Sequence, residues 1–351
     1  MSSLPPVPAD LPDAPLTVDS PGDVPAVDPG FVRVAAIDCG TNSIRLLIAD
    51  VDAERNQLRD HVRLMEVVRL GQGVDKTGEL APQALERTLD ATRRYAQLCQ
   101  HYGVQRIRFV ATSATRDASN RHVFVEGVRE ALGVDPEVVS GQEEATLSFR
   151  GAISALDERH RGPFLVVDLG GGSTELVLGT TSPVGAYSMD VGCVRMSERH
   201  LQSDPPTDAE IAAAAADINR AIDEAAKVVP LERTATLVGL AGSITTVTAH
   251  VLALREYDRD AINGAVMSLA DAQAACDNLL RRNRLERAAL GFMHPGRVDV
   301  IGAGALVWST VMARVQAAVA QAGGRLTTTV TSEHDILDGI ALSLGSAGDS
   351  Y

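Results

Sequence analysis

The sequence predicts an α/β fold built from two related units, and three observations support this prediction. Residues 31–51 and 162–179 repeat one pattern: an apolar β run, an aspartate, a turn rich in glycine and hydroxyl side chains, and a second β run. Strand and helix patterns alternate along the rest of the chain, which implies partly parallel sheets. Finally, 45% hydrophobic residues in a chain of 351 supply enough apolar surface for the cores of one or two domains.

The first half of the chain opens with a nearly continuous apolar run, as expected of a buried strand, and continues as an antiparallel meander. Ser140 and Glu143 have the spacing of a capping box, in which the Glu143 side chain would reach back to the cap N–H. A polar turn is expected over 112–117. The predicted strands cover 32–37, 44–50, 57–69, 107–111 and 137–139, and the predicted helices cover 82–101, 120–132 and 140–156.

The second half repeats the opening motif and then alternates strands with Ala-rich helices. Thr207 and Glu210, after two prolines, mark one helix start. A largely apolar helix includes Trp308, which we assign to the core, and Ser332 is expected to cap the last helix. The segment 162–179 is predicted to hold two strands around the second turn, and further strands are predicted over 184–190, 236–240 and 325–330. The predicted helices cover 207–228, 268–282, 303–321 and 333–344, and one more helix is expected after residues 241–246.

The charge of the chain limits the partners that we expect, and its cysteines and N-terminus indicate a compartment. The formal net charge is −14, and lysine occurs only at Lys76 and Lys227. An acidic body argues against specific nucleic-acid binding, which requires a basic surface, but allows a polyanionic substrate at a locally basic or metal-bearing site. Four widely spaced cysteines and the lack of a signal peptide or long apolar span predict a cytoplasmic protein without a membrane segment. Residues 1–30, with half of the sixteen prolines, are expected to be a disordered tail.

The two repeated turns are the strongest candidates for function. Gly40, Thr41, Asn42 and Ser43 form the first turn, and Gly170, Gly171, Gly172, Ser173 and Thr174 form the second. Glycine-rich turns expose successive backbone N–H groups, and such groups hold phosphate. Asp38 and Asp168 end the strands that enter these turns. A carboxylate there is placed to hold Mg²⁺, although each Asp could instead cap its own turn.

Arginines and glutamates near the turns supply candidates for catalysis. Arg45 and Arg116 suit phosphate because their planar guanidinium groups give paired hydrogen bonds, with a surface ion pair as the alternative for each. Glu144 is the best candidate for a general base, because Glu143 already has a capping role and leaves Glu144 free to face a cleft. A surface glutamate favoured by the helix dipole is the alternative for Glu144. Glu175, directly after the second turn, could be a second base or a metal ligand.

Several other chemistries lack their sequence signatures. There is no G-x-S-x-G nucleophile motif, no Walker A motif and no H-x-x-x-H zinc pattern. The chemistry that remains is metal-assisted phosphoryl transfer, either to water or to a bound acceptor.

Four segments together resemble the signature of the exopolyphosphatase and guanosine pentaphosphate phosphohydrolase (Ppx/GppA) family. The resemblance covers roughly residues 31–345 and rests on the segments 38–46, 140–145, 168–175 and 192–195. It implies two ribonuclease-H-like α/β domains of the actin-like ATPase superfamily around a central cleft. The implied domains are 31–157 plus 332–347 and 158–331. Residues 238–243 and 297–301 resemble further segments of that superfamily and of this family.

The resemblance also implies roles for individual residues. Glu144 takes the place of the catalytic base, with Glu175 beside it. Asp168, Asp38 and Glu175 stand at metal positions for Mg²⁺ or another divalent cation. The residues implied in holding substrate phosphate are Gly40, Thr41, Asn42, Ser43, Arg45, Arg116, Gly170, Gly171, Gly172, Ser173 and Thr174.

The resemblance implies an exopolyphosphatase that releases terminal orthophosphate from inorganic polyphosphate by attack of a water activated by Glu144. Guanosine pentaphosphate is the alternative substrate, and an actin-like kinase or a non-catalytic nucleotide-binding protein is the alternative of another class. A homodimer is expected, in a short form without the helical C-terminal module of longer relatives. Residues 336–339 read Ile-Leu-Asp-Gly where the family has Leu-Arg-Glu-Gly, and we interpret Asp338 as replacing a basic residue.

Overall fold

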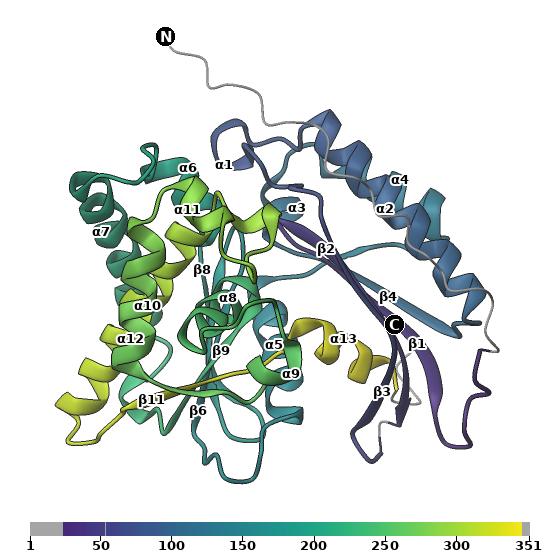
Figure 1. Cartoon of the computed structure of the whole chain (residues 1–351). Coiled ribbons are helices and arrows are strands. Elements are labelled where there is room, and N and C mark those ends of the chain that lie inside the picture. Colours follow the sequence, from purple (N-terminus) through teal and green to yellow (C-terminus); the bar gives the residue numbers. More distant parts are fainter. Residues whose placement is uncertain (1–23, 53, 346–351) are drawn as a thin grey trace.

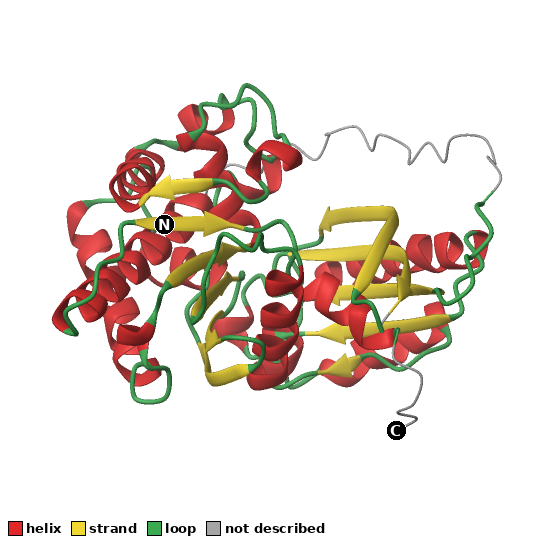
Figure 2. Ribbon diagram, turned by 90° about the horizontal axis from the view of Figure 1, so that it is seen from below, coloured by secondary structure: helices red, strands yellow, loops and turns green. Residues whose placement is uncertain are grey.

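The computed structural model describes residues 24–52 and 54–345, which form two β-sheets with helices around and between them (Figures 1 and 2). Most of the predicted tail, residues 1–23, lies outside the described residues. The described part of it contacts the first sheet: the carbonyl oxygen of Pro25 accepts a hydrogen bond from Arg33 at 2.8 Å, and Asp28 pairs with Arg59 at 2.6 Å.

The first sheet has the order β3-β2-β1-β4-β5, and its first three strands form the predicted antiparallel meander. β4 and β5 then run parallel to β1. Helices α1, α2 and α4 contribute to the core of this unit, where Tyr95, Phe109 and Phe124 are fully buried. The elements are β1 Val32–Cys39, β2 Ser43–Asp52, β3 Gln57–Val67, α1 Val74–Thr77, α2 Pro82–His101, β4 Arg106–Ala111, α3 Ser113–Asp117, α4 Arg121–Leu132 and β5 Glu137–Val138.

The second sheet repeats this topology, with the order β8-β7-β6-β9-β11 and β10 added at the far edge. β6, β7 and β8 form an antiparallel meander, and β9 is parallel to β6. The internal repeat therefore extends from one turn to a whole five-stranded sheet, which confirms the predicted fold class. The strands are β6 Phe164–Leu169, β7 Thr174–Gly179, β8 Pro183–Met189, β9 Thr236–Leu240, β10 Val266–Ser268 and β11 Thr328–Thr331.

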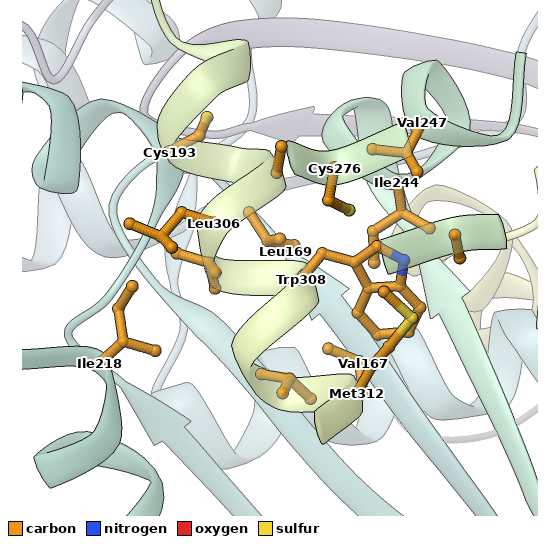
Figure 3. Close-up of a cluster of buried hydrophobic side chains, with 14 of the residues drawn as sticks. Val167, Leu169, Cys193, Ile218, Ile244, Val247, Cys276, Leu306, Trp308 and Met312 are labelled. Atoms are coloured by element: carbon orange, nitrogen blue, oxygen red, sulfur yellow. The ribbon is translucent and has the colours of Figure 1, made fainter. Parts of the chain in front are cut away.

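Helix α12 (Ile301–Gln321) forms the centre of the second core, and Trp308 and Met312 on it are fully buried (Figure 3). Among the described helices, α12 alone is long and apolar enough to cross a membrane, but 56% of its apolar window is buried inside the protein's own core. Trp308 thus has the predicted structural role. The other helices of this unit are α6 Cys193–His200, α7 Asp208–Ala225, α8 Ala241–Val251, α9 Arg259–Ile262, α10 Leu269–Arg281 and α11 Arg284–Ala288.

Two helices, α5 (Gly141–Ser154) and α13 (Ile336–Leu344), cross between the sheets (Figure 1). α5 packs Phe149 against the second sheet, whereas α13 packs Ile340 against the first sheet. Leu147 of α5 also packs into the core that α13 shares with the first sheet, so α5 contacts both units, and the division into 31–157 plus 332–347 and 158–331 stays a prediction. Glycines make the crossing close: a Cβ on Gly339 would collide with the carbonyl oxygen of Leu147, and a Cβ on Gly151 would collide with that of Asp335.

We expect Gly339→Ala to destabilise the protein by about 1–3 kcal/mol, because the added methyl group has to push the two helices apart. Urea unfolding measures this change. Thr146→Ala, on the exposed face of α5, is the control and is expected to stay within about 0.5 kcal/mol of wild type. An alanine at 339 that leaves the unfolding midpoint unchanged would show that the crossing tolerates separation.

The structure corrects several local predictions. Residues 113–117 form the short helix α3 rather than a turn, and α6 was not predicted as a helix. The cap of α13 is Asp335 rather than Ser332, because the Asp335 carboxylate accepts from the backbone N–H of Leu337 at 3.0 Å. Glu143 does not close a capping box at α5: its carboxylate accepts from Arg108 at 2.7 Å, although Ser140 does cap the helix.

The interpretation of Asp338 as replacing a basic residue is wrong. Position by position, Leu337 takes the place of the family's arginine and Asp338 that of its glutamate. Asp338 completes the capping box of α13 and pairs with Arg63 at 2.6 Å. Asp338 is 1% exposed, and this burial by itself would raise the pKa of its carboxyl. The hydrogen bonds from His334 and Arg63 outweigh the effect of burial and hold the pKa well below its usual range. Its role is therefore structural.

Candidate active site

The two predicted phosphate turns have the same geometry and lie at equivalent places in the two sheets. In the first, the N–H of Gly40 donates to the carbonyl oxygen of Ser43 at 3.0 Å, and in the second, Gly170 donates to Ser173 at the same distance. Sheet register pairs Asp38 with Arg45 across the first turn and Asp168 with Glu175 across the second. At equivalent positions of the repeat, the first unit thus has the cation of Arg45 and the second has the carboxylate of Glu175.

The turns touch each other across the gap between the two units. A Cβ on Gly172 would lie 2.6 Å from the Thr41 hydroxyl and 2.7 Å from that of Ser113, and a Cβ on Gly171 would lie 2.9 Å from the Thr41 Cβ. Thr41 and Ser113 are themselves hydrogen-bonded at 3.0 Å. Positions 171 and 172 need glycine, because a Cβ at either position would lie too close to the first turn.

A cavity of about 100 Å³ opens where the turns meet. Most of the predicted site residues line it: Asp38, Gly40, Thr41, Asn42, Ser43, Arg45, Glu144, Asp168, Gly170, Gly171, Ser173 and Glu175. Gly172, Thr174 and Arg116 are outside this lining. Thr174 is fully buried, and its hydroxyl donates to the carbonyl oxygen of Val191 at 2.6 Å, so it braces the second turn instead of facing the cavity.

Glu144 lies in the first turn of α5 and faces this cavity, although it is only 7% exposed. Arg116 donates to its carboxylate at 3.1 Å and to the carbonyl oxygen of Val139 at 3.1 Å. Burial raises the pKa of Glu144 to about 8, despite the attraction of Arg116. A carboxylate held by one arginine, with a pKa near neutrality, suits a general base. Arg116 is placed to orient Glu144.

Asp168 and Glu175 are each held by a serine from a neighbouring element. Ser148 of α5 donates to Asp168 at 2.5 Å, and Ser188 of β8 donates to Glu175 at 2.7 Å. Burial raises the pKa of Asp168 to about 7 and that of Glu175 well above its usual value, and neighbouring carboxylates add to both shifts. Three buried carboxyl groups close to one another, those of Glu144, Asp168 and Glu175, favour the binding of a positive charge beside them.

Arg45 lies between two carboxylates, those of Asp38 and Asp335. It donates to Asp38 at 2.7 Å and also to Asp335. Its guanidinium group is occupied by these carboxylates, so its predicted contact with phosphate stays a prediction. The second oxygen of Asp38, Oδ1, is buried without a hydrogen-bond partner, and burial raises the pKa of Asp38.

The donor set suits a hard divalent cation. Among residues 24–52 and 54–345, no group of three or more His, Cys, Asp or Glu side chains is arranged to hold a metal by itself. Mg²⁺, however, takes only one or two carboxylates and fills its remaining positions with water and substrate oxygens. The unpartnered oxygen of Asp38 and the buried carboxylate of Asp168 fit that requirement.

Four further residues belong to the site: Asp335 and Ser148 were not predicted, whereas Ser243 and Arg297 lie in the segments 238–243 and 297–301 that the resemblance singled out without making them site residues. Asp335 and Ser148 act on Arg45 and Asp168, as described above. Ser243 and Arg297 line the cavity from the second unit, where Arg297 makes only a weak hydrogen bond to Thr246 at 3.4 Å. Ser243 was detectable, because Gly242-Ser243 follows β9 as a third glycine and hydroxyl turn at the end of a strand. The other three depend on contacts between distant segments.

These carboxyls give the metal-free protein a defined pH dependence. The folded-state pKa values of Glu144 and Asp168 lie above their unfolded values, so their contribution to stability is present at low pH and is lost as pH rises through about 7 to 8. His250 and His294, with lowered pKa values, oppose this trend below about pH 6.5. We expect the melting temperature without metal to fall between pH 6.5 and 8, and to fall less in Glu144→Gln. Scanning calorimetry of both proteins measures this, and a wild-type melting temperature that rises over this interval would contradict it.

Comparison with known proteins gives a consistent family assignment. A model of the Ppx/GppA phosphatase family matches residues 47–326. The chain is 50% identical to exopolyphosphatase 2 of Mycobacterium tuberculosis, over 90% of this chain and 99% of that protein. It is also 35% identical to a guanosine-5′-triphosphate,3′-diphosphate pyrophosphatase of Pseudoalteromonas atlantica, over 51% of this chain and 35% of that protein.

Solved structures agree with the sequence matches. An exopolyphosphatase-like protein superposes with a TM-score of 0.87 at 49% identity, covering 90% of this chain and 98% of that one. A Ppx/GppA family member from Aquifex aeolicus superposes with a TM-score of 0.71 at 26% identity, covering 90% and 97% of the two chains. Each of these two superpositions covers 90% of this chain.

Proposed function

Because the chain belongs to the Ppx/GppA phosphatase family, we propose that it is a phosphohydrolase that releases terminal orthophosphate from inorganic polyphosphate. One observation carries the proposal: two phosphate turns meet at a small cavity, and a buried carboxylate with a pKa of about 8, Glu144, lines the same cavity. A cavity of about 100 Å³ has room for the end of a phosphate chain together with water.

In the proposed reaction, Glu144 accepts a proton from water while the water oxygen bonds to the terminal phosphorus. The bond between that phosphorus and the bridging oxygen breaks, and the shortened chain leaves with the bridging oxygen. The backbone N–H groups of the two turns hold the terminal phosphate, and Arg116 keeps the Glu144 carboxylate aimed at the water. Mg²⁺, held by Asp38 and Asp168 with Glu175 beside them, would neutralise charge on the phosphate oxygens when bound.

A second candidate substrate is guanosine pentaphosphate, and a larger cavity next to the first favours it. This cavity measures about 550 Å³, within the usual range of roughly 300–1,000 Å³ for small-molecule sites. The two cavities adjoin, because both are lined by Arg45, Met65, Ala241, Gly242 and Arg297.

The lining of this larger cavity combines apolar and cationic groups. Leu64, Tyr257, Phe292, Met293 and Leu337 supply apolar surface that an inorganic phosphate chain does not need. Nε and Nη2 of Arg259 on the same wall make no hydrogen bond with a described residue, although the guanidinium group pairs with Glu333 at 3.6 Å and Asp60 at 3.8 Å, so an additional phosphate group would compete with these carboxylates. Here Leu337, in place of the family's arginine, makes the wall more apolar.

One set of substrates separates these candidates. Tripolyphosphate and guanosine pentaphosphate present the same triphosphate end, so their ratio of kcat/KM isolates the contribution of the nucleoside. A long polyphosphate chain tests the value of additional phosphates. Faster release from either inorganic chain than from guanosine pentaphosphate supports the exopolyphosphatase, and the opposite order supports the second candidate. ATP-dependent phosphorylation of an added acceptor, with no release of orthophosphate, would indicate a kinase.

We further propose a cytoplasmic homodimer that binds no specific nucleic acid. The four buried, unpaired cysteines fit a reducing compartment, and the net charge of −14 opposes nucleic-acid binding. Analytical ultracentrifugation of the purified chain tests the oligomeric state: a single species with the mass of one chain would remove the dimer from the proposal.

A further inference from the structure

The segment from Gly192 to Arg195 lies at the start of α6, behind the second phosphate turn. The backbone N–H of Cys193 donates to the carbonyl oxygen of Gly170 at 3.0 Å, and those of Val194 and Arg195 donate to the carbonyl oxygen of Gly171 at 2.9 and 3.1 Å. Gly192 permits this approach, because a Cβ there would collide with the Gly171 backbone. The first turn of α6 is therefore attached directly to the second phosphate turn.

The side chain of Arg195 points away from its own turn and reaches the first unit. It donates to Asp75 at 2.9 Å and to Asp117 at 2.5 Å, and it is only 11% exposed. Arg199 donates to Asp75 at 2.6 and 2.7 Å, and the Glu198 carboxylate accepts from the N–H of Gly73 at 3.1 Å. We call these contacts the α6 bridge; its members are Gly73, Asp75 and Asp117 of the first unit and Arg195, Glu198 and Arg199 of the second.

On the side of the first unit, the α6 bridge ends at the elements that build the rest of the site. Asp117 is the last residue of α3. The same short helix carries Ser113, hydrogen-bonded to Thr41 of the first phosphate turn, and Arg116, which holds Glu144. Through Arg195 the second phosphate turn is thus connected to the first turn and to the base by a continuous set of contacts.

We propose that Arg195 is a positioning residue that keeps the two phosphate turns together, and so sets the affinity of the site for the terminal phosphate. The proposal rests on the proposed function, because it assumes that both turns hold one phosphate. A largely buried arginine with two carboxylate partners stabilises the contact between its elements more than an exposed ion pair does. Without the Arg195 side chain, the two phosphate turns would lie apart in a larger fraction of the substrate-free molecules.

This role affects binding and turnover differently. Apparent affinity falls in proportion to the fraction of molecules with the turns together. Turnover at saturation changes little, because bound phosphate itself brings the turns together. The expected result for Arg195→Gln is a KM that rises roughly 5- to 20-fold, with kcat within about twofold of wild type.

Hydrogen–deuterium exchange of the substrate-free protein tests the inference independently of catalysis. Arg195→Gln is expected to speed backbone exchange at residues 40–43 and 170–173, without a general increase elsewhere. The control is Arg314→Gln, which removes an equal charge from the Arg314–Asp223 pair inside the second unit and is expected to leave both turns unchanged. Unchanged exchange at both turns in Arg195→Gln would overturn the inference. It would do so even if the protein proved to hydrolyse none of the proposed substrates.

Kinetics with tripolyphosphate complete the test. Arg195→Lys, which keeps the charge, is expected to recover part of the lost affinity. The double variant Arg195→Gln/Asp117→Asn is expected to have a KM no higher than the worse single variant, because both changes remove one contact. A fall confined to kcat, or fully additive effects of the two changes, would show that Arg195 does not act by holding the turns together.

Discussion

Replacing Glu144 by glutamine is expected to lower the rate of orthophosphate release by about 100-fold or more, because a positioned base contributes about 10²–10⁴-fold. Glutamine keeps the size of the side chain and can still interact with Arg116, but it cannot accept a proton from water. The change also removes a buried carboxyl, so we expect the fold to be retained and KM to change little. Steady-state kinetics of phosphate release, with circular dichroism to confirm the fold, measures the effect.

Glu143 provides the matched control on the same helix. Its carboxylate lies near the surface and pairs with Arg108 at 2.7 Å, away from the cavity. Glu143→Gln removes the same charge one position earlier and is expected to keep kcat within about twofold of wild type, as for other surface substitutions. A Glu144→Gln enzyme with near wild-type turnover would remove Glu144 from the mechanism.

The second large effect is expected at Asp168. Asp168→Asn keeps the hydrogen bond from Ser148 but removes a negative charge from the proposed metal site, and we expect kcat to fall on the order of 10²–10³-fold. Loss of several kcal/mol of charge stabilisation in the transition state corresponds to that range. Isothermal titration with Mg²⁺ on the same variant is expected to show weaker binding.

Asp190, the exposed residue directly after β8, is the control for this change. Asp190→Asn has the same chemistry outside the cavity and is expected to leave both kcat and Mg²⁺ affinity unchanged. Full activity of Asp168→Asn, or of wild type after exhaustive treatment with a chelator, would contradict a metal-assisted reaction at this site.

The sequence predicted those parts of the fold that local patterns determine. The repeated strand–turn–strand segments gave both phosphate turns and, through Asp38 and Asp168, the two equivalent positions of the site. Apolar runs such as that of β1 identified buried strands, and Ser140 identified the start of α5. Each of these depends on neighbouring residues only, so a single sequence contains the information.

Contacts between distant segments could not be predicted in the same way. The sequence predicted a phosphate contact for Arg45, which stays a prediction, but it did not predict that Asp335, 290 residues later in the chain, accepts a hydrogen bond from its guanidinium group. Glu143 had the spacing of a capping box, yet Arg108 on β4 provided a stronger, charged partner. Which partner such a side chain chooses depends on how the two units pack, and no local pattern reports that.

The most direct test of the central claim is the product pattern from a polyphosphate chain of defined length with Mg²⁺, followed by ³¹P NMR. The account predicts that orthophosphate appears from the first time point, that chains shorten from their ends, and that Glu144→Gln stops this. Internal cleavage into medium-length fragments, or no orthophosphate from polyphosphate or from guanosine pentaphosphate, would contradict it.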